Sequence, residues 1–151
     1  MNSLIECRKG KNMNRSKSRE LAFKLVYERE IQKEVDDDEL EIFLEANEIE
    51  NDEVKEYLKD ILFGISENQE KITELIKKNL KENWEIDRVS KINISLLKVA
   101  IYEIIYKNIP YKVAINEVVE LAKKYSDEQG SSFVNGILAS IVKEEKLDIG
   151  E

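Results

Sequence analysis

The sequence predicts an all-α protein, a compact single-domain bundle of about seven helices. Its 151 residues suit one domain with a substantial core. With only 5 glycines and 1 proline, little in the chain interrupts a helix. Charged residues make up 37% of the chain, and apolar residues recur among them at the spacing of amphipathic helices.

The first helix is predicted from about Arg15 to Lys33, because two apolar rows there follow an i, i+3, i+4 pattern. Residues 36–39 form an acidic cluster that could resemble a metal site. We interpret it instead as the start of a second, short helix, in which Asp36 and Glu39 form a capping box. Cations in the first turn of the first helix oppose the helix dipole, which favours a functional role for them.

A third helix is predicted to begin at Asn51-Asp52, and a fourth after a second capping-box match at Ser66 and Gln69. Gly64, inside the third helix, suggests a close contact with another helix. Trp84 is predicted to anchor the connection of residues 85–89 into the central helix. These assignments rest on local patterns of polar caps and apolar repeats.

The core is predicted to centre on two helices that meet at Pro110. Residues 92–108 carry two apolar i, i+4 rows, which indicates a helix touched by several neighbours. The second helix is predicted from Tyr111 to Tyr125. A polar loop with Gly130 is then expected over residues 126–132, before a last helix. Three further positions are interpreted as packing residues: Asn116 and Asn135 as buried amides that fix the hairpin, and Gly136 as a site of close helix packing.

The net charge of −8 is distributed unevenly. Residues 1–19 carry +5, so the rest of the chain carries −13. A basic start on an acidic body indicates local contact with an anionic partner, or a frayed, solvated terminus. Residues 1–12 are predicted to be a disordered leader, with Met13 as a possible biological start. Residues 146–151 are predicted to be a charged tail.

The composition argues against catalysis. The chain has no histidine, and its one cysteine, Cys7, lies in the polar leader. A disulfide framework, a zinc site and histidine-based acid–base chemistry are therefore not expected. No phosphate loop, dinucleotide fingerprint or activated nucleophile is visible. We expect no enzyme activity, cofactor, metal or small-molecule substrate. No apolar run approaches bilayer-spanning length and no signal peptide is apparent, so we expect a soluble cytoplasmic protein with no membrane partner.

Two stretches carry a family resemblance. Residues 109–125, IPYKVAINEVVELAKKY, and residues 133–138, FVNGIL, resemble the signature of the bacterial transcription antitermination factor NusB family. Residues 19–27 resemble the family's first helix, and residues 84–103 resemble its central helix and the approach to it. The resemblance covers about residues 13–143, and it implies a NusB-like helical RNA- and protein-binding domain over residues 13–145.

The resemblance also implies a function. NusB pairs with the ribosomal small-subunit protein called NusE, and the pair binds box A RNA in nascent ribosomal transcripts. In the elongation complex it helps RNA polymerase pass terminators, and so regulates transcription and its termination. Two alternatives remain open. The domain also precedes the catalytic domain of some RNA cytosine methyltransferases, and a helical interaction module without RNA would show the same patterns.

Carried over by position, the resemblance assigns site residues. It implies RNA contacts at six positions: Arg15, Lys17, Arg19, Lys112, Gln129 and Phe133. It implies a NusE-facing surface at Tyr27 and at Asn93, which stands where an acidic residue is common. Each aromatic has an alternative interpretation. Phe133 has the spacing of a core residue with Ile137 and Ile141, and Tyr27 could be a half-buried core tyrosine.

Overall fold

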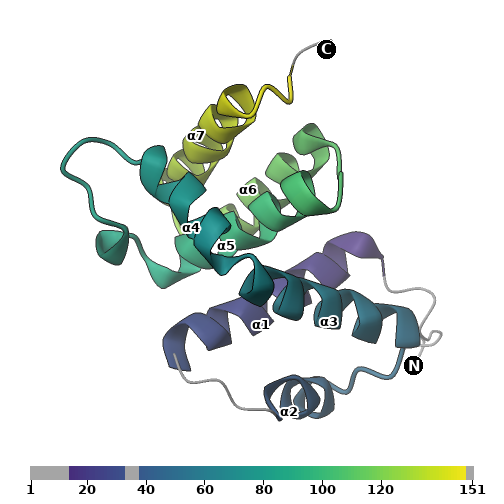
Figure 1. Cartoon of the computed structure of the whole chain (residues 1–151). Helices are drawn as coiled ribbons and strands as arrows, with labels where there is room; N and C mark the ends of the chain where they lie inside the picture. Colours follow the sequence, from purple (N-terminus) through teal and green to yellow (C-terminus); the bar gives the residue numbers. More distant parts are fainter. Residues whose placement is uncertain (1–13, 33–37, 149–151) are drawn as a thin grey trace. The chain divides into compact units, whose positions relative to one another are not determined.

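The computed structural model describes residues 14–32 and 38–148, and all regular structure in these ranges is helical. It contains seven α-helices, one 3₁₀ turn and one π-helical turn (Figure 1). The predicted all-α class is confirmed. The chain divides into two units, one ending at Gly64 and one beginning at Ile65, so the boundary lies inside α3 (Asp52–Glu67). The predicted leader, Met13 and the last three residues of the predicted tail lie outside the described residues.

The first unit contains α1 (Arg15–Gln32), α2 (Glu39–Ala46) and most of α3. The side-chain oxygen of Asn14 accepts a hydrogen bond from the Lys17 backbone N–H at 2.8 Å. This N-cap contact satisfies an amide that the first helical turn leaves unpaired. α1 then buries four apolar side chains at helical spacing: Ala22, Phe23, Leu25 and Val26. The predicted first helix is confirmed as far as Gln32.

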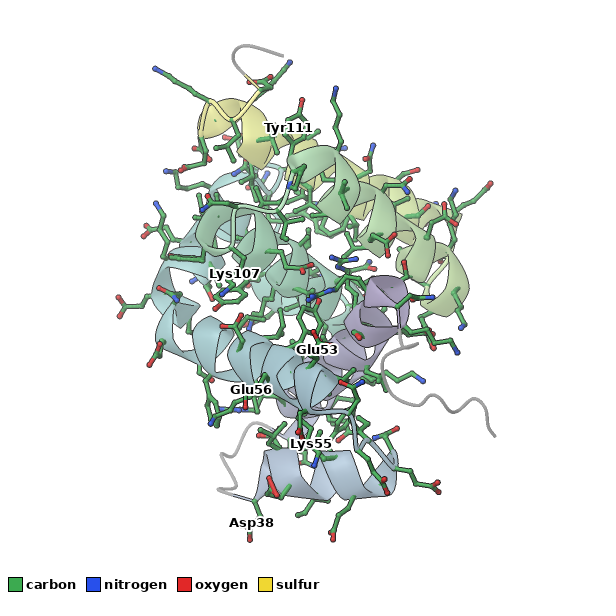
Figure 2. The ribbon with its side chains drawn as sticks, turned by 90° about the vertical axis from the view of Figure 1, so that its right-hand side faces the viewer. Asp38, Glu53, Lys55, Glu56, Lys107 and Tyr111 are labelled. Carbon is green, nitrogen blue, oxygen red and sulfur yellow. The ribbon has the colours of Figure 1, made fainter. Side chains whose placement is uncertain are left out.

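Of the predicted helix starts in this unit, one is confirmed and the other lies partly outside the described residues. Asn51 caps α3, because its Oδ1 accepts from the Val54 N–H at 3.0 Å. α2, however, begins after Asp38, which makes no side-chain capping bond. Asp36 lies outside the described residues, so its predicted capping box with Glu39 stays a prediction, and Glu39 forms an ion pair with Arg29 at 3.0 Å. Figure 2 shows Asp38 directly before α2.

The second predicted capping box, at Ser66 and Gln69, is wrong. α3 continues to Glu67, so Ser66 lies inside its last turn. α4 (Gln69–Lys78) begins after Asn68, which makes no side-chain capping bond. The apolar periodicity of α3 runs through Ile65, which is buried, and this burial keeps the helix going past the local motif.

The core of the second unit is the central helix α5 (Lys91–Ile101). It follows a 3₁₀ turn (Ile86–Arg88) and is capped by Ser90, whose hydroxyl oxygen accepts from the Asn93 N–H at 3.1 Å. The side chains of residues 94–101 are all buried. This confirms the predicted wide apolar face, and it explains why helices on several sides can pack on α5.

α5 ends in a π-helical turn (Tyr102–Tyr106) before α6 (Tyr111–Tyr125). The Glu103 carbonyl oxygen accepts from two backbone amides, Lys107 at 3.2 Å and Ile109 at 3.0 Å. Asn108 adopts a positive φ of 55°. A wider turn and a left-handed residue reverse the chain just before Pro110, where the residue preceding proline disfavours helix. Figure 2 shows Lys107 and Tyr111 on either side of this reversal.

The connection from α6 to α7 (Glu128–Glu144) is much shorter than predicted. The loop expected over residues 126–132 consists of Ser126 and Asp127 alone. Asp127 caps α7, because its Oδ1 accepts from the Gly130 N–H at 2.7 Å. A Cβ at Gly130 would overlap the Ser126 side chain, so glycine permits this tight turn and does not mark a loop. α6 and α7 consequently lie side by side (Figure 1).

Three packing interpretations on this hairpin are wrong. Asn116 and Asn135, expected to be buried, are both exposed. Gly136, expected to allow close helix packing, is exposed as well, and a Cβ there would meet nothing within 4 Å. The small and amide side chains of the family-like stretch thus face outward, where they are available to a partner.

Candidate nucleic-acid interface

Two exposed cations mark the start of α1. Arg15 and Lys17, which we call the basic helix start, are both exposed, and the first turn of α1 contains no acidic residue. The Arg15 guanidinium lies over the ring of Tyr57 on α3, 4.4 Å from its centroid. This is a cation–π geometry, and it holds the charge in one place. Lys17 has its backbone amide capped by Asn14 and its side chain in solvent.

Arg19 differs from the other two cations. Its side chain is only 2% exposed, and it is engaged in an interaction within the protein. Arg19 follows Arg15 by one helical turn and lies on the same side of α1, whereas Lys17, two residues from each, points to a different side. Arg19 lies on the side of α1 that buries Ala22 and Val26. Direct phosphate contact is therefore available to the basic helix start and not to Arg19 in this conformation.

In the second unit, two aromatic rings stack at the surface. Phe133 of α7 is partly buried, and its ring centroid lies 6.1 Å from that of Trp84, with 28° between the planes. Trp84 is 52% exposed. We call Trp84 and Phe133 the aromatic pair. Phe133 is therefore neither a fully buried core residue nor a fully exposed aromatic ring, which were the two alternatives left open by the sequence. Trp84 packs on α7 and does not simply anchor the connection to α5.

The remaining predicted RNA residues, Lys112 and Gln129, are both exposed. Lys112 lies in the first turn of α6, with its amino group 5.9 Å from the centroid of the Tyr111 ring. Gln129 lies in the first turn of α7. Because the two helices form a hairpin, their starts lie at opposite ends, roughly 20 Å apart. Gln129 lies close to Phe133, one turn along α7, whereas Lys112 does not.

The two residues assigned to a protein partner lie in different units. Tyr27 is partly exposed on α1, and its ring is 6.1 Å from that of Phe23. Asn93 is in the first turn of α5. Its side-chain Oδ1 is buried and accepts no hydrogen bond from the described residues.

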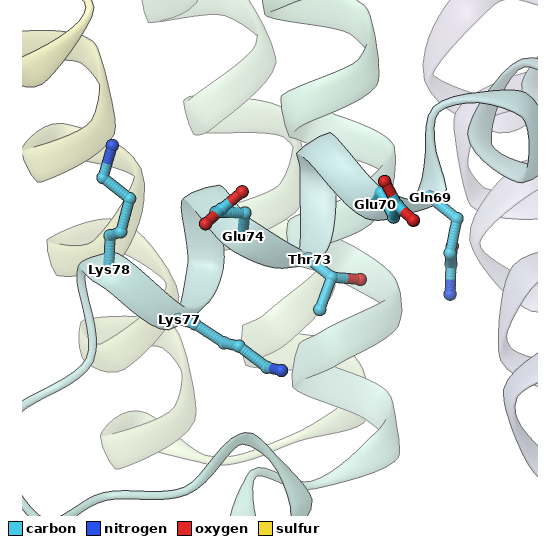
Figure 3. Close-up of a pocket in the computed structure, with 6 residues that line it drawn as sticks. All are labelled: Gln69, Glu70, Thr73, Glu74, Lys77 and Lys78. Carbon is cyan, nitrogen blue, oxygen red and sulfur yellow. The ribbon is translucent and has the colours of Figure 1, made fainter.

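The other surface features of the described residues give no sign of a ligand-binding site. A hollow of about 510 Å³ is lined by one helix alone, α4, with Gln69, Thr73 and Lys77 along one side and Glu70 and Glu74 along the other (Figure 3). Among the described residues, no group of three or more acidic, cysteine or histidine side chains could hold a metal ion. No helix in the same ranges is long and apolar enough to cross a membrane.

Comparison with known proteins decides the family. The model of the NusB family matches residues 16–143, which is most of the chain and spans both units. The chain belongs to the NusB family. The transcription antitermination protein NusB of Clostridium acetobutylicum is 50% identical over 131 residues, covering 86% of this chain and 96% of that protein.

Solved structures of family members agree. The crystal structure of the antitermination factors NusB and NusE in complex with dsRNA superposes with a TM-score of 0.79 at 28% identity, covering 86% of this chain and 96% of that one. NusB of T. maritima superposes with a TM-score of 0.78 at 33% identity, covering 90% and 98%. The helical fold described above is therefore the NusB fold, as the sequence predicted.

Sequence reasoning missed two features of this interface. It did not find the partner of Trp84, because the two rings come from distant parts of the chain. It also did not find Tyr57 beneath Arg15. The available signal for the first was a single tryptophan in a strongly charged stretch, KENWEIDR at residues 81–88, where burial is not expected.

Proposed function

We propose that this protein is a transcription antitermination factor. Together with the ribosomal protein NusE it binds box A RNA in nascent ribosomal transcripts, and it helps the elongating RNA polymerase to read through terminators. It acts in the cytoplasm, and it acts by binding and not by catalysis. The observation that carries the proposal is the match, over nearly the whole chain, to a NusB that was solved with NusE and RNA.

The surface of the protein supports an RNA partner at two places. The basic helix start offers two exposed cations, which suit phosphate oxygens. On α7, the exposed Gln129 lies within one turn of the partly buried Phe133, so a polar and an aromatic group lie close together at this end of the helix. Lys112 is a separate cation for the RNA backbone.

The charge distribution supports a need for a protein partner. Outside residues 1–19 the chain carries −13, which repels RNA over most of its surface. A basic ribosomal protein bound to this chain neutralises part of this charge. RNA affinity therefore increases when NusE is bound, and by linkage RNA strengthens the binding of NusE by the same factor.

A binding titration tests the proposal. Labelled box A RNA is titrated with the protein alone and with the protein plus NusE, beside a scrambled single strand and a duplex of equal length. We expect tighter binding to box A than to the scrambled strand, and a further gain with NusE. Equal affinity for all three RNAs, or no gain with NusE, would contradict the proposal.

Tyr27→Asp tests the assigned protein surface. A carboxylate in the contact should weaken NusE binding while the free protein keeps its RNA affinity. Gln32→Asp is a matched control, because it adds the same charge at an exposed position of the same helix. Normal NusE binding by Tyr27→Asp would remove Tyr27 from the interface.

The alternative of an accessory domain of an RNA cytosine methyltransferase is not supported by the relatives. The Clostridium acetobutylicum protein is matched over 96% of its own length, which leaves no space in that relative for a catalytic domain. No contact or cavity among the described residues favours a helical module without RNA.

A further inference from the structure

Trp84 occupies an unusual position for the only tryptophan of the chain. It lies in the connection between α4 and the 3₁₀ turn, and 52% of its surface is exposed. A large apolar ring is normally buried, since burial removes it from water. Here one side rests on Phe133 and the rest faces outward. The fold therefore holds an aromatic surface at the exterior.

The connection that carries Trp84 is held at its start by Asn79 and contains a hydrogen-bonded turn before the ring. At its start, the Asn79 amide nitrogen donates to the Leu75 carbonyl at 2.8 Å and to the Glu144 carboxylate at 3.0 Å. Ser140 of α7 donates to the Asn79 side-chain oxygen. Next to the ring, the backbone N–H of Trp84 donates to the Lys81 carbonyl oxygen at 3.0 Å. The hydrogen bonds order the backbone at Trp84, and the ring itself contacts Phe133.

The surface of α7 next to Phe133 is open. Gly136 follows Phe133 by one helical turn, and apart from its chain neighbours and the local backbone of α7, no atom lies within 4 Å of where its Cβ would be. Glycine in the middle of a helix is less favourable than alanine, so internal packing gives no reason for it. An exposed glycine one turn from the partly buried Phe133 lets a flat or bulky group approach the helix backbone closely.

The charge around Trp84 restricts what can bind there. Glu82, Glu85 and Asp87 are exposed near it in the sequence, beside the cations Lys81 and Arg88. The acidic residues outnumber the basic ones in this segment, so an RNA phosphate would find no net electrostatic attraction beside the Trp84 ring. An uncharged flat group can bind there by stacking, because every nucleobase has a face that stacks on aromatic rings.

We propose that the aromatic pair is a stacking site for an unpaired base of single-stranded RNA, in which Trp84 contacts the base and Phe133 is a positioning residue that holds the Trp84 ring. The proposal rests on the proposed RNA-binding function, and it adds a contact residue and a mode of recognition. Gly136 gives the sugar next to that base access to α7. The site contributes affinity that salt does not weaken, since it exchanges no counterions with the RNA.

Trp84→Ala is the main test. RNA affinity, followed by the anisotropy of a labelled box A strand, should fall about 5- to 150-fold, the effect of losing one base–aromatic stack. The slope of affinity against salt should stay the same. Trp84→Phe keeps a ring and should retain most of the affinity. Phe63→Ala is a matched control, because Phe63 is an aromatic residue of similar exposure, 48%, on α3.

Intrinsic fluorescence provides a second measurement on the unmodified protein. Because Trp84 is the only tryptophan, its emission reports this site alone. Stacking of a base should quench it, with the same midpoint as the anisotropy titration. Phe133→Leu should reduce both the quenching and the affinity, and Phe133→Tyr should restore them, which a purely structural role of Phe133 would not do.

The possible failures are distinguishable. If the wild type binds no RNA, the proposed function and the stacking site both fail. If the wild type binds box A RNA but Trp84→Ala and Trp84→Leu bind equally well, only the stacking site is overturned. If these variants keep their RNA affinity and lose NusE, the ring belongs to a protein interface. Unquenched emission at saturating RNA also overturns the proposal.

Discussion

At the start of α1 a cation rests on an aromatic ring, whereas beside α7 one aromatic ring rests on another. Both arrangements hold a group at the surface in a fixed position, but they offer different forces. Charge acts over about 8–10 Å and is screened by salt. Stacking acts only at contact and is insensitive to salt. The comparison teaches that ionic strength can separate the two surfaces experimentally, even when both bind the same RNA.

The largest expected effect is on stability, from Arg19→Ala. Buried cations are paired in folded proteins, so the substitution leaves a partner group without its charge. We expect a loss of about 3–5 kcal/mol in the free energy of unfolding, measured by urea denaturation. Lys17→Ala, two residues earlier and exposed, should cost almost nothing. Equal stability of the two variants would show that Arg19 is a surface cation like its neighbours.

The next effect concerns the basic helix start. The double substitution of Arg15 and Lys17 by alanine removes two phosphate contacts. The slope of log affinity against log salt should become shallower by about 1.4 units for single-stranded RNA. Titrations at four or more salt concentrations, compared with Trp84→Ala, would measure this. An unchanged slope in the double variant would remove the basic helix start from the RNA site.

A smaller effect is expected from Tyr57→Leu. The ring beneath Arg15 contributes about 0.5–1 kcal/mol at an exposed site, and it restricts the guanidinium. Leucine keeps a bulky apolar side chain but has no aromatic face for the guanidinium. Arg15 itself is retained, so RNA affinity should fall less than in the Arg15→Ala variant. Tyr57→Phe keeps the face and should behave as wild type. If leucine and phenylalanine gave the same affinity, the ring would have no role in positioning Arg15.

The smallest effect concerns the polar contacts that join α4 to α7. The hydrogen bond from Asn79 lowers the pKa of Glu144, and the nearby Lys78 ammonium at 3.4 Å adds to this effect. A carboxyl with a lowered folded-state pKa stabilises the protein above its ordinary pKa, and that contribution disappears as the pH falls through the folded value. Glu144 is exposed, so the contribution is small.

Glu144→Gln tests this pH dependence. The stability difference between wild type and the variant should be present near neutral pH and should disappear between about pH 5 and pH 3. Thermal melts at several pH values measure it. The amide still accepts a hydrogen bond from Asn79, so any difference reports the charge. A difference that grows as the pH falls would have the wrong sign for a carboxylate held ionised by its neighbours.

Much of the fold could be predicted from local patterns. The bounds of α6 follow from Pro110 and from apolar spacing that persists to Tyr125, and the N-cap at Asn51 follows from its short polar side chain. The central position of α5 follows from an apolar face wider than one neighbour could cover. In each case the decisive interaction lies within a few residues in the sequence.

The remaining features depend on contacts that the sequence does not display. The Ser66 motif has the form of a helix start, but burial of Ile65 in the same turn overrides it. Gly130 has the form of a loop residue, yet the constraint on it is the Ser126 side chain. The sequence shows Arg19 as one more cation near the N-terminus, whereas in the structure its side chain lies on the buried side of α1, away from solvent. The aromatic pair joins two distant segments, and no periodicity connects them.

The two-residue connection between α6 and α7 also has a consequence for the order of folding. Closing a short loop restricts few residues, so this hairpin can form before contacts that require long loops. We expect the turn of Ser126 and Asp127, with Gly130 in the first turn of α7 beside it, to belong to the earliest structure that appears in the chain. The start of α7, including Phe133, would then be in place before slower parts of the molecule finish folding.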